Sequence, residues 1–119
     1  MNQAFEVGLH VVKQIQETQQ TAIDQASKLI ADAFVAENKF FVTGSGHSHT
    51  VTEDFYVRAG GLVFPLPMLT TELTFNEHPH KSSLLERVDG YGSILVDLYN
   101  IQENDVVLVV SNSGRNAYP

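Results

Sequence analysis

The first third of the chain repeats apolar positions with the period of an α-helix. Between residues 2 and 37 there is no proline, and no glycine follows Gly8. The apolar residues recur at spacings of three and four, which is typical of an amphipathic helix; they are Leu9, Val12, Ile15, Ile23, Ala26, Leu29, Ile30, Ala33 and Phe34. This pattern predicts one helix of roughly 50 Å or two helices joined near residues 17–21. A helix this long favours packing against a second chain, so we expect a helical dimer face.

After residue 38 the pattern changes to that of an α/β protein. Residues 39–43 and 106–110 are rich in aromatic and β-branched residues and predict short strands. Residues 62–64 predict another strand, which Pro65 and Pro67 should end because proline cannot donate to a β-ladder. The unbroken apolar run at 106–110 indicates a strand covered on both faces of a parallel sheet. Strands alternating with helices predict a three-layer α-β-α fold with a Rossmann-like parallel sheet.

Capping and stop signals place helices between these strands. Residues 50–53 and 83–86 both have capping-box spacing, in which a hydroxyl precedes a glutamate by three positions. Glycines at 60–61 and 90 provide stop signals. Three helices are therefore predicted, over residues 50–59, 83–89 and 91–99, the last with Ile94, Leu95 and Leu98 on one face. The polar residues 70–80 predict an irregular loop over a site.

Two of the predicted strands lead into short loops of glycine and serine. Residues 40–43 are followed by Gly-Ser-Gly-His-Ser at 44–48, and residues 106–110 by Ser-Asn-Ser-Gly at 111–114. Glycine lets backbone N–H groups approach a ligand, and hydroxyls and a helix N-terminus add further attraction for an anion. Ligands of such folds bind at the carboxyl ends of the strands. The two loops together therefore predict a site that holds one phosphate group.

Composition narrows the classes of protein and partner. The chain has 119 residues, 43% of them hydrophobic and 18% charged, which fits one soluble globular domain. A net charge of −7 with only seven basic residues argues against nucleic acid. There is no cysteine, no basic leader and no apolar run of membrane-spanning length. We therefore expect a cytoplasmic protein with no membrane association.

The loops and the segment between them resemble the SIS (sugar isomerase) domain family. The resemblance rests on residues 44–48, Phe55–Gly61 and Ser111–Asn116 and covers essentially the whole chain. It is closest to uncharacterised bacterial SIS proteins described as phosphosugar or phosphoheptose isomerases. It implies a five-stranded parallel sheet flanked by helices in a dimer or tetramer. Because family domains continue past the second motif, we expect the N-terminal part of one SIS domain, with a helical arm at 1–37 and an α/β core at 38–119.

The resemblance also implies what the loops bind. It assigns the phosphate of a phosphorylated sugar to the two loops, through Gly46, Ser48, Ser111, Asn112, Ser113 and Asn116. Position 116 is often threonine in the family, so Asn116 departs from the pattern. The implied activity is aldose–ketose isomerisation without a cofactor, an activity that truncation is able to remove. The alternatives are a non-catalytic sugar-phosphate sensing module and a SIS-type lyase acting on an amino-sugar phosphate ether.

Isomerisation transfers a proton between adjacent carbons, which requires a general base that works near neutral pH. Glu53 in the helix after the first loop is one candidate, and Glu77 and His78 in the polar loop are others. His47 and His49 are expected to contact substrate hydroxyls or water. They and a second His-x-His at 78–80 also leave a metal-dependent hydrolase open, although no third ligand with recognisable spacing accompanies them, so we expect no metal.

Overall fold

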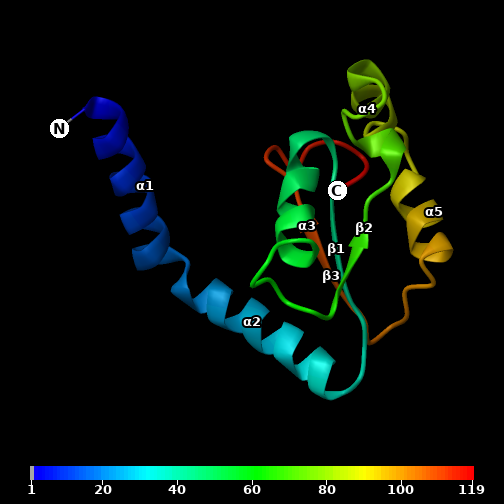
Figure 1. Ribbon diagram of the computed structural model, residues 1–119, viewed down its shortest axis with the longest axis horizontal. Coiled ribbons are helices and arrows are strands. Elements are labelled where there is room, and N and C mark those ends of the chain that lie inside the picture. The colour runs from blue at the N-terminus through cyan, green and yellow to red at the C-terminus, as the bar shows by residue number, and fades with distance from the viewer. Residues whose placement is uncertain (1) are drawn as a thin grey trace. The chain divides into compact units, whose positions relative to one another are not determined.

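The structure, a computed structural model, describes residues 2–119 and divides into two compact units. One unit ends at Asp32 and the other spans Ala33–Pro119. The first unit contains α1 (Gln3–Thr18) and most of α2 (Gln20–Val35), drawn in blue and cyan in Figure 1. Of the two predicted arrangements, the one with two helices is therefore found.

The helices of the arm separate at a single residue. Gln19 has φ −110° and ψ 0°, outside the helical range, although its N–H still donates to the Ile15 carbonyl at 2.8 Å. The side chain of Asn2 caps the other end of α1 by accepting from the Ala4 N–H at 3.0 Å. No residue of α1 is buried.

The second unit contains a parallel sheet of three strands, β1 (Phe40–Gly44), β2 (Pro65–Met68) and β3 (Val106–Val110), in the order β2-β1-β3. Phe40 lies opposite Pro65 on one side and Val106 on the other. The α/β class, the parallel sheet and the strands at 39–43 and 106–110 are thus confirmed.

The strand predicted at 62–64 is wrong, because β2 occupies the Pro-Leu-Pro-Met segment that was expected to end it. In a strand, successive N–H groups point to opposite sides, so Pro65 and Pro67 lack donors on the same side. β2 has β1 on one side only and is an edge strand of this sheet. An edge strand can place both missing donors on its open side, which explains why proline is tolerated here.

The helices of the second unit are α3 (His49–Tyr56), α4 (Pro79–Leu85) and α5 (Tyr91–Leu98), with short 3₁₀ turns at Gly46–Ser48 and Thr71–Leu73. Both capping-box predictions are wrong. The helix near Thr50 begins earlier, and the Thr50 hydroxyl donates backwards to the His47 carbonyl at 2.9 Å. Proline favours the first turn of a helix, and α4 begins at Pro79. The helix therefore ends close to residues 83–86, where the second capping box predicted that it would begin.

Helices cover both faces of β1, which gives the predicted three layers (Figure 1). Phe40 makes an edge-to-face contact with Phe55 of α3, with ring centroids 6.1 Å apart. The next residue, Phe41, points to the other face, where it belongs to a core cluster with Leu95 of α5. That cluster is completed by Met68, Leu73 and Tyr118. Leu73 is 1% exposed, so the segment predicted as an irregular loop contributes to the core.

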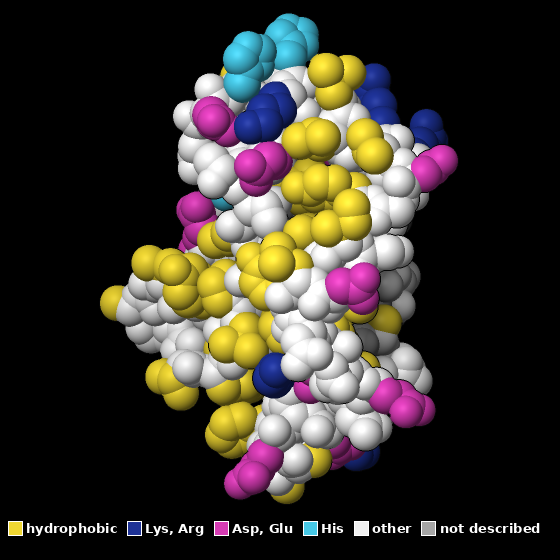
Figure 2. All heavy atoms as spheres, turned by 90° about the vertical axis from the view of Figure 1, so that its right-hand side faces the viewer, with side chains coloured by type: hydrophobic (Ala, Val, Ile, Leu, Met, Phe, Trp, Pro, Cys, Tyr) yellow, Lys and Arg dark blue, Asp and Glu magenta, His cyan; other side chains and the backbone are white. Residues whose placement is uncertain are grey.

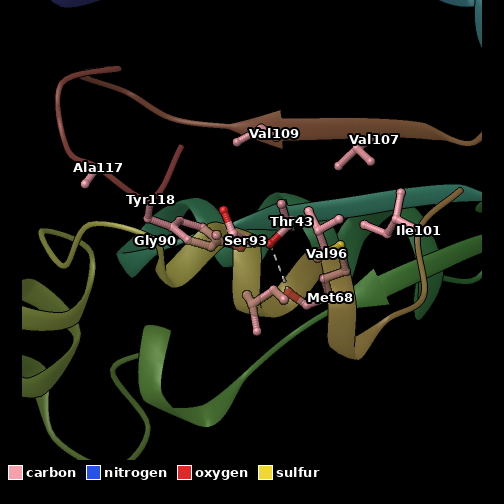
Figure 3. Close-up of a pocket in the computed structure, with 12 residues that line it drawn as sticks. Thr43, Met68, Gly90, Ser93, Val96, Ile101, Val107, Val109, Ala117 and Tyr118 are labelled. Carbon is pink, nitrogen blue, oxygen red and sulfur yellow. Dashed lines mark hydrogen bonds between the residues drawn. The ribbon is translucent and has the colours of Figure 1, made fainter. Parts of the chain in front are cut away.

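β3 is less covered than predicted. Val107 and Val109 are 37% and 44% exposed, whereas every residue of β1 is buried. Between β3 and α5 lies a cavity of about 420 Å³ with largely apolar walls, into which Val96, Ile101 and Tyr118 project (Figure 3). Thr43 also lines this cavity, and its hydroxyl donates to the Met68 carbonyl at 3.0 Å.

The apolar face predicted for residues 91–99 is only partly buried. Leu95 is 3% exposed, but Ile94 and Leu98 are 61% and 71% exposed. Figure 2 views this side of the molecule and shows apolar side chains gathered on its surface. In the part of the chain that the structure describes, no helix combines the length and apolar character needed to cross a membrane.

Candidate functional site

The first loop is formed by a close approach of the chain to itself. A Cβ atom on Gly44, the last residue of β1, would lie 2.8 Å from the backbone carbonyl of Ser48. The Ser48 N–H donates to the Ser45 carbonyl at 3.1 Å, which closes the turn. Gly46 has φ +57°, and a Cβ there would lie 3.2 Å from the Phe75 ring. Glycine at 44 and 46 therefore brings Ser48 directly over the end of β1.

The second loop begins beside the first because Gly44 and Val110 are paired across β1 and β3. The Ser111 hydroxyl accepts a hydrogen bond from the Gly114 N–H at 2.9 Å, and Gly114 has φ +57°. Ser111 and Ser113 are exposed. The register of the sheet places the two loops at the same edge.

A cavity of about 360 Å³ lies between the two loops. Its walls are mainly hydroxyl, amide and backbone groups, and the lining residues are Ser45, Gly46, His47, Ser48, Glu86, Ser111, Asn112, Ser113 and Asn116. All six residues predicted to bind phosphate are thus brought together, with His47. No lysine or arginine is among the described residues that line the cavity. An anion here would be held by neutral donors and by the positive end of the helical segment that starts at Gly46.

His47 and His49 have separate surroundings. The ring of His47 is exposed at the cavity and packs against Phe75, with centroids 4.3 Å apart. His49 is 7% exposed, and its two ring nitrogens contact the Gly46 carbonyl and, at 3.5 Å, Glu53. His49 does not line the cavity, so its expected contact with substrate stays a prediction.

The three predicted base candidates also lie outside the cavity. Glu53 borders a separate surface depression with Asp54 and Arg58. Glu77 and His78 border another, beside α4. The Lys81 ammonium, 2.6 Å from the Glu77 carboxylate, lowers the pKa of Glu77, which is the opposite of the shift that a base working near neutral pH needs. Their catalytic roles stay predictions.

The histidine pairs do not gather a metal-ligand set. The rings of His78 and His80 are 6.2 Å apart. Among residues 2–119 no group of three or more histidine, aspartate or glutamate side chains is arranged to hold a metal ion.

One ionisable residue of the cavity was missed by the sequence interpretation. Glu86 lines the cavity, and its Oε2 accepts a hydrogen bond from the Ser45 hydroxyl at 2.9 Å. Its spacing from Ser83 predicts a capping box, which would use the carboxylate at the start of a helix. Glu86 instead follows the last residue of α4. The only sequence signal for this was Pro79, which marks the true start of the helix.

The fold and the site define a parallel α/β protein with a hydroxyl-lined cavity between two loops at the carboxyl ends of adjacent strands. The chain belongs to the SIS domain family, whose sequence profile matches residues 5–119. It is similar to UPF0309 protein BH3325 of Halalkalibacterium halodurans, with 40% identity over 109 residues, or 92% of this chain and 45% of that protein. A UPF0309 protein of Brucella anthropi is 41% identical over 95 residues, which cover 80% of this chain and 39% of the relative. The chain thus spans less than half the length of these relatives.

Proposed function

We propose that the cavity between the two loops binds the phosphate group of a phosphorylated sugar, and that the protein isomerises this sugar between aldose and ketose forms. The observation that supports the proposal most directly is that Ser48, Ser111 and Ser113, from loops more than sixty positions apart in sequence, line one cavity. Membership of the SIS domain family supports a phosphosugar ligand independently. A volume of about 360 Å³ is within the range of small-ligand pockets.

Binding is tested with fructose 6-phosphate and inorganic phosphate by isothermal titration calorimetry. Each hydroxyl that donates to a charged oxygen contributes about 1.5–3 kcal/mol. The double substitution Ser48→Ala with Ser113→Ala should therefore weaken fructose 6-phosphate binding by at least about 100-fold. Ser93→Ala is the matched control, because Ser93 lines the other, apolar cavity. Equal affinity in the double variant and the control would refute the phosphate site.

A non-catalytic sensing module is the second candidate, and a specific observation favours it: Glu53, Glu77 and His78 all lie outside the cavity. An isomerase moves a proton to and from a carbon of the bound sugar, whereas a sensing module does not. Incorporation of solvent deuterium at C1 of bound fructose 6-phosphate in D₂O identifies an isomerase, and binding without exchange identifies a sensor.

We further propose that the protein is a cytoplasmic homo-oligomer assembled through the helical arm. Phe5, Leu9, Val12 and Ile15 of α1 are between 46% and 68% exposed. Burial of apolar side chains of this size contributes about 1.5–3 kcal/mol each, so a second copy of the arm is a favourable partner. Leu9→Gln with Val12→Gln should lower the mass measured by light scattering to that of a monomer. Glu17→Gln on α1 should leave the mass unchanged.

A further inference from the structure

The backbone of Glu86 is held by its own helix, α4, and by the segment around Tyr118. Its N–H donates to the Ser82 carbonyl at 3.1 Å, and its carbonyl accepts from the Tyr118 N–H at 3.0 Å. Ser82 is itself 1% exposed, and its hydroxyl donates to the Leu73 carbonyl at 2.9 Å. The end of α4 is therefore fixed against the core, and the position of Glu86 follows from it.

The Glu86 side chain faces the candidate phosphate cavity. It is half-buried, and Oε2 accepts from the Ser45 hydroxyl at 2.9 Å. No second hydrogen bond to this carboxylate is present among residues 2–119. Glu86 is also the only carboxylate among the described residues that line the cavity. One carboxylate oxygen is thus fixed by the first loop, and the other is available to a ligand.

The charge of Glu86 determines what it can contact. A carboxylate repels a phosphate dianion, and this repulsion is strong where solvent is partly excluded. A sugar phosphate is therefore expected to place its phosphate among Ser48, Ser111 and Ser113 and to turn its uncharged carbons and hydroxyls toward Glu86. A carboxylate in that position is suited to accept a proton from a carbon next to a carbonyl group.

We propose that Glu86 is the general base that moves the proton between C1 and C2 of the sugar, a step that rests on the function proposed above. The C2–H bond of the open-chain aldose breaks, the proton moves to the Glu86 carboxylate, and the electron pair forms the C1=C2 bond of an enediolate with its charge on O1. Glu86 then returns the proton to C1, while the O2–H proton moves to O1 and C2=O forms. The product is the ketose, and no oxidant or reductant is consumed.

Glu86→Gln tests this step, because the glutamine carbonyl oxygen can still accept from Ser45 but cannot act as a base. The probe is fructose 6-phosphate in D₂O, with deuterium incorporation at C1 followed by ¹H NMR and affinity by calorimetry. We expect exchange to fall by about 100-fold or more while the Kd changes by less than about threefold. Glu86→Asp retains a carboxylate and should exchange at an intermediate rate.

Two further variants separate chemistry from positioning. Ser45→Ala removes the hydrogen bond but leaves the carboxylate, so exchange should fall by no more than about tenfold. Glu103→Gln makes the same change of charge in the exposed turn before β3 and should have no effect. Equal losses in Glu86→Gln and Ser45→Ala would show that Glu86 only supports the loop and would overturn the proposal.

The remaining outcomes distinguish this proposal from the function on which it rests. If the wild-type chain binds fructose 6-phosphate but exchanges no deuterium, the role of Glu86 as base is refuted and the phosphate site stands. If the wild-type chain binds neither fructose 6-phosphate nor inorganic phosphate, the proposed function itself fails.

Discussion

The two serine loops occupy equivalent places in the sheet but are built differently. The first is braced: Gly44 and Gly46 are buried, His47 packs against Phe75, and Ser45 is bonded to Glu86. Residues 111–115 of the second are exposed, and the one side-chain hydrogen bond of this loop within the described chain joins Ser111 to Gly114. The first loop is therefore held by several contacts, whereas the second has few contacts that fix it. We call the first loop braced and the second adaptable.

The difference between the two loops changes the entropy that each would lose on binding a ligand. A donor that is already fixed loses little conformational entropy when the ligand arrives, whereas ordering a loop backbone costs about 1–2 kcal/mol per residue. If the cavity binds phosphate as proposed, the first loop should set where the phosphate lies, and the exposed second loop should adjust to it.

The largest expected effect comes from replacing the glycine that closes the first loop. In Gly44→Ala the new Cβ would lie 2.8 Å from backbone atoms of Ser48, which cannot move without opening the turn. We expect a loss of about 3 kcal/mol in the free energy of unfolding, measured by urea denaturation, together with loss of phosphate binding.

The matched change in the second loop is Gly114→Ala. Gly114 has φ +57°, but no atom lies within 4 Å of the new Cβ. Only the strain of the left-handed backbone remains, about 1 kcal/mol. Equal destabilisation by the two substitutions would contradict the contrast between a braced and an adaptable loop.

An effect of comparable size is expected on proteolysis of the second loop. Arg115 is exposed and offers trypsin a site beside Ser113. If the loop becomes ordered around the ligand, saturating fructose 6-phosphate should slow cleavage after Arg115 by about tenfold, which corresponds to 1.4 kcal/mol. Cleavage after Lys13, in the arm, provides the internal reference and should not change. Equal protection at both sites would indicate a general effect of the ligand on trypsin or on the whole chain.

The elements that were predicted correctly from the sequence are those determined by the local pattern of apolar residues and glycines. The strand at 106–110 is an unbroken apolar run, and the first loop follows another such run with glycine at 44 and 46. Because parallel strands end at the same edge, these two facts were enough to predict that the loops share a site. The individual cavity residues, apart from Ser45 and Glu86, were predicted from the two loop motifs together with their resemblance to the SIS family.

The elements that sequence did not predict depend on position in the assembled sheet. Pro65 and Pro67 end a central strand but not an edge strand, and only the strand order shows that β2 is at an edge. Glu86 was misassigned because its spacing from Ser83 fits a capping box, while the helix had already begun at Pro79. Its approach to Ser45, 41 positions away, follows from tertiary packing that no local pattern encodes.

The smallest expected effect tests whether the second loop is independent of the other end of its strand. Before β3, the Asp105 carboxylate accepts from the N–H groups of Gln102 at 2.9 Å and Lys39 at 2.8 Å. These bonds lower the pKa of Asp105.

A carboxyl whose pKa is lowered by folding stabilises the protein above its unfolded pKa, near 3.9, and this stabilisation is lost as the pH falls through the folded pKa. Asp105→Asn should cost about 0.5 kcal/mol at pH 7, since the group is near the surface, and the difference from wild type in urea denaturation should shrink at pH 3. Because the substitution acts at the amino end of β3, it should not alter cleavage after Arg115 or the affinity for phosphate. A change in either would show that the second loop is held through its strand and is not independent of the other end of β3.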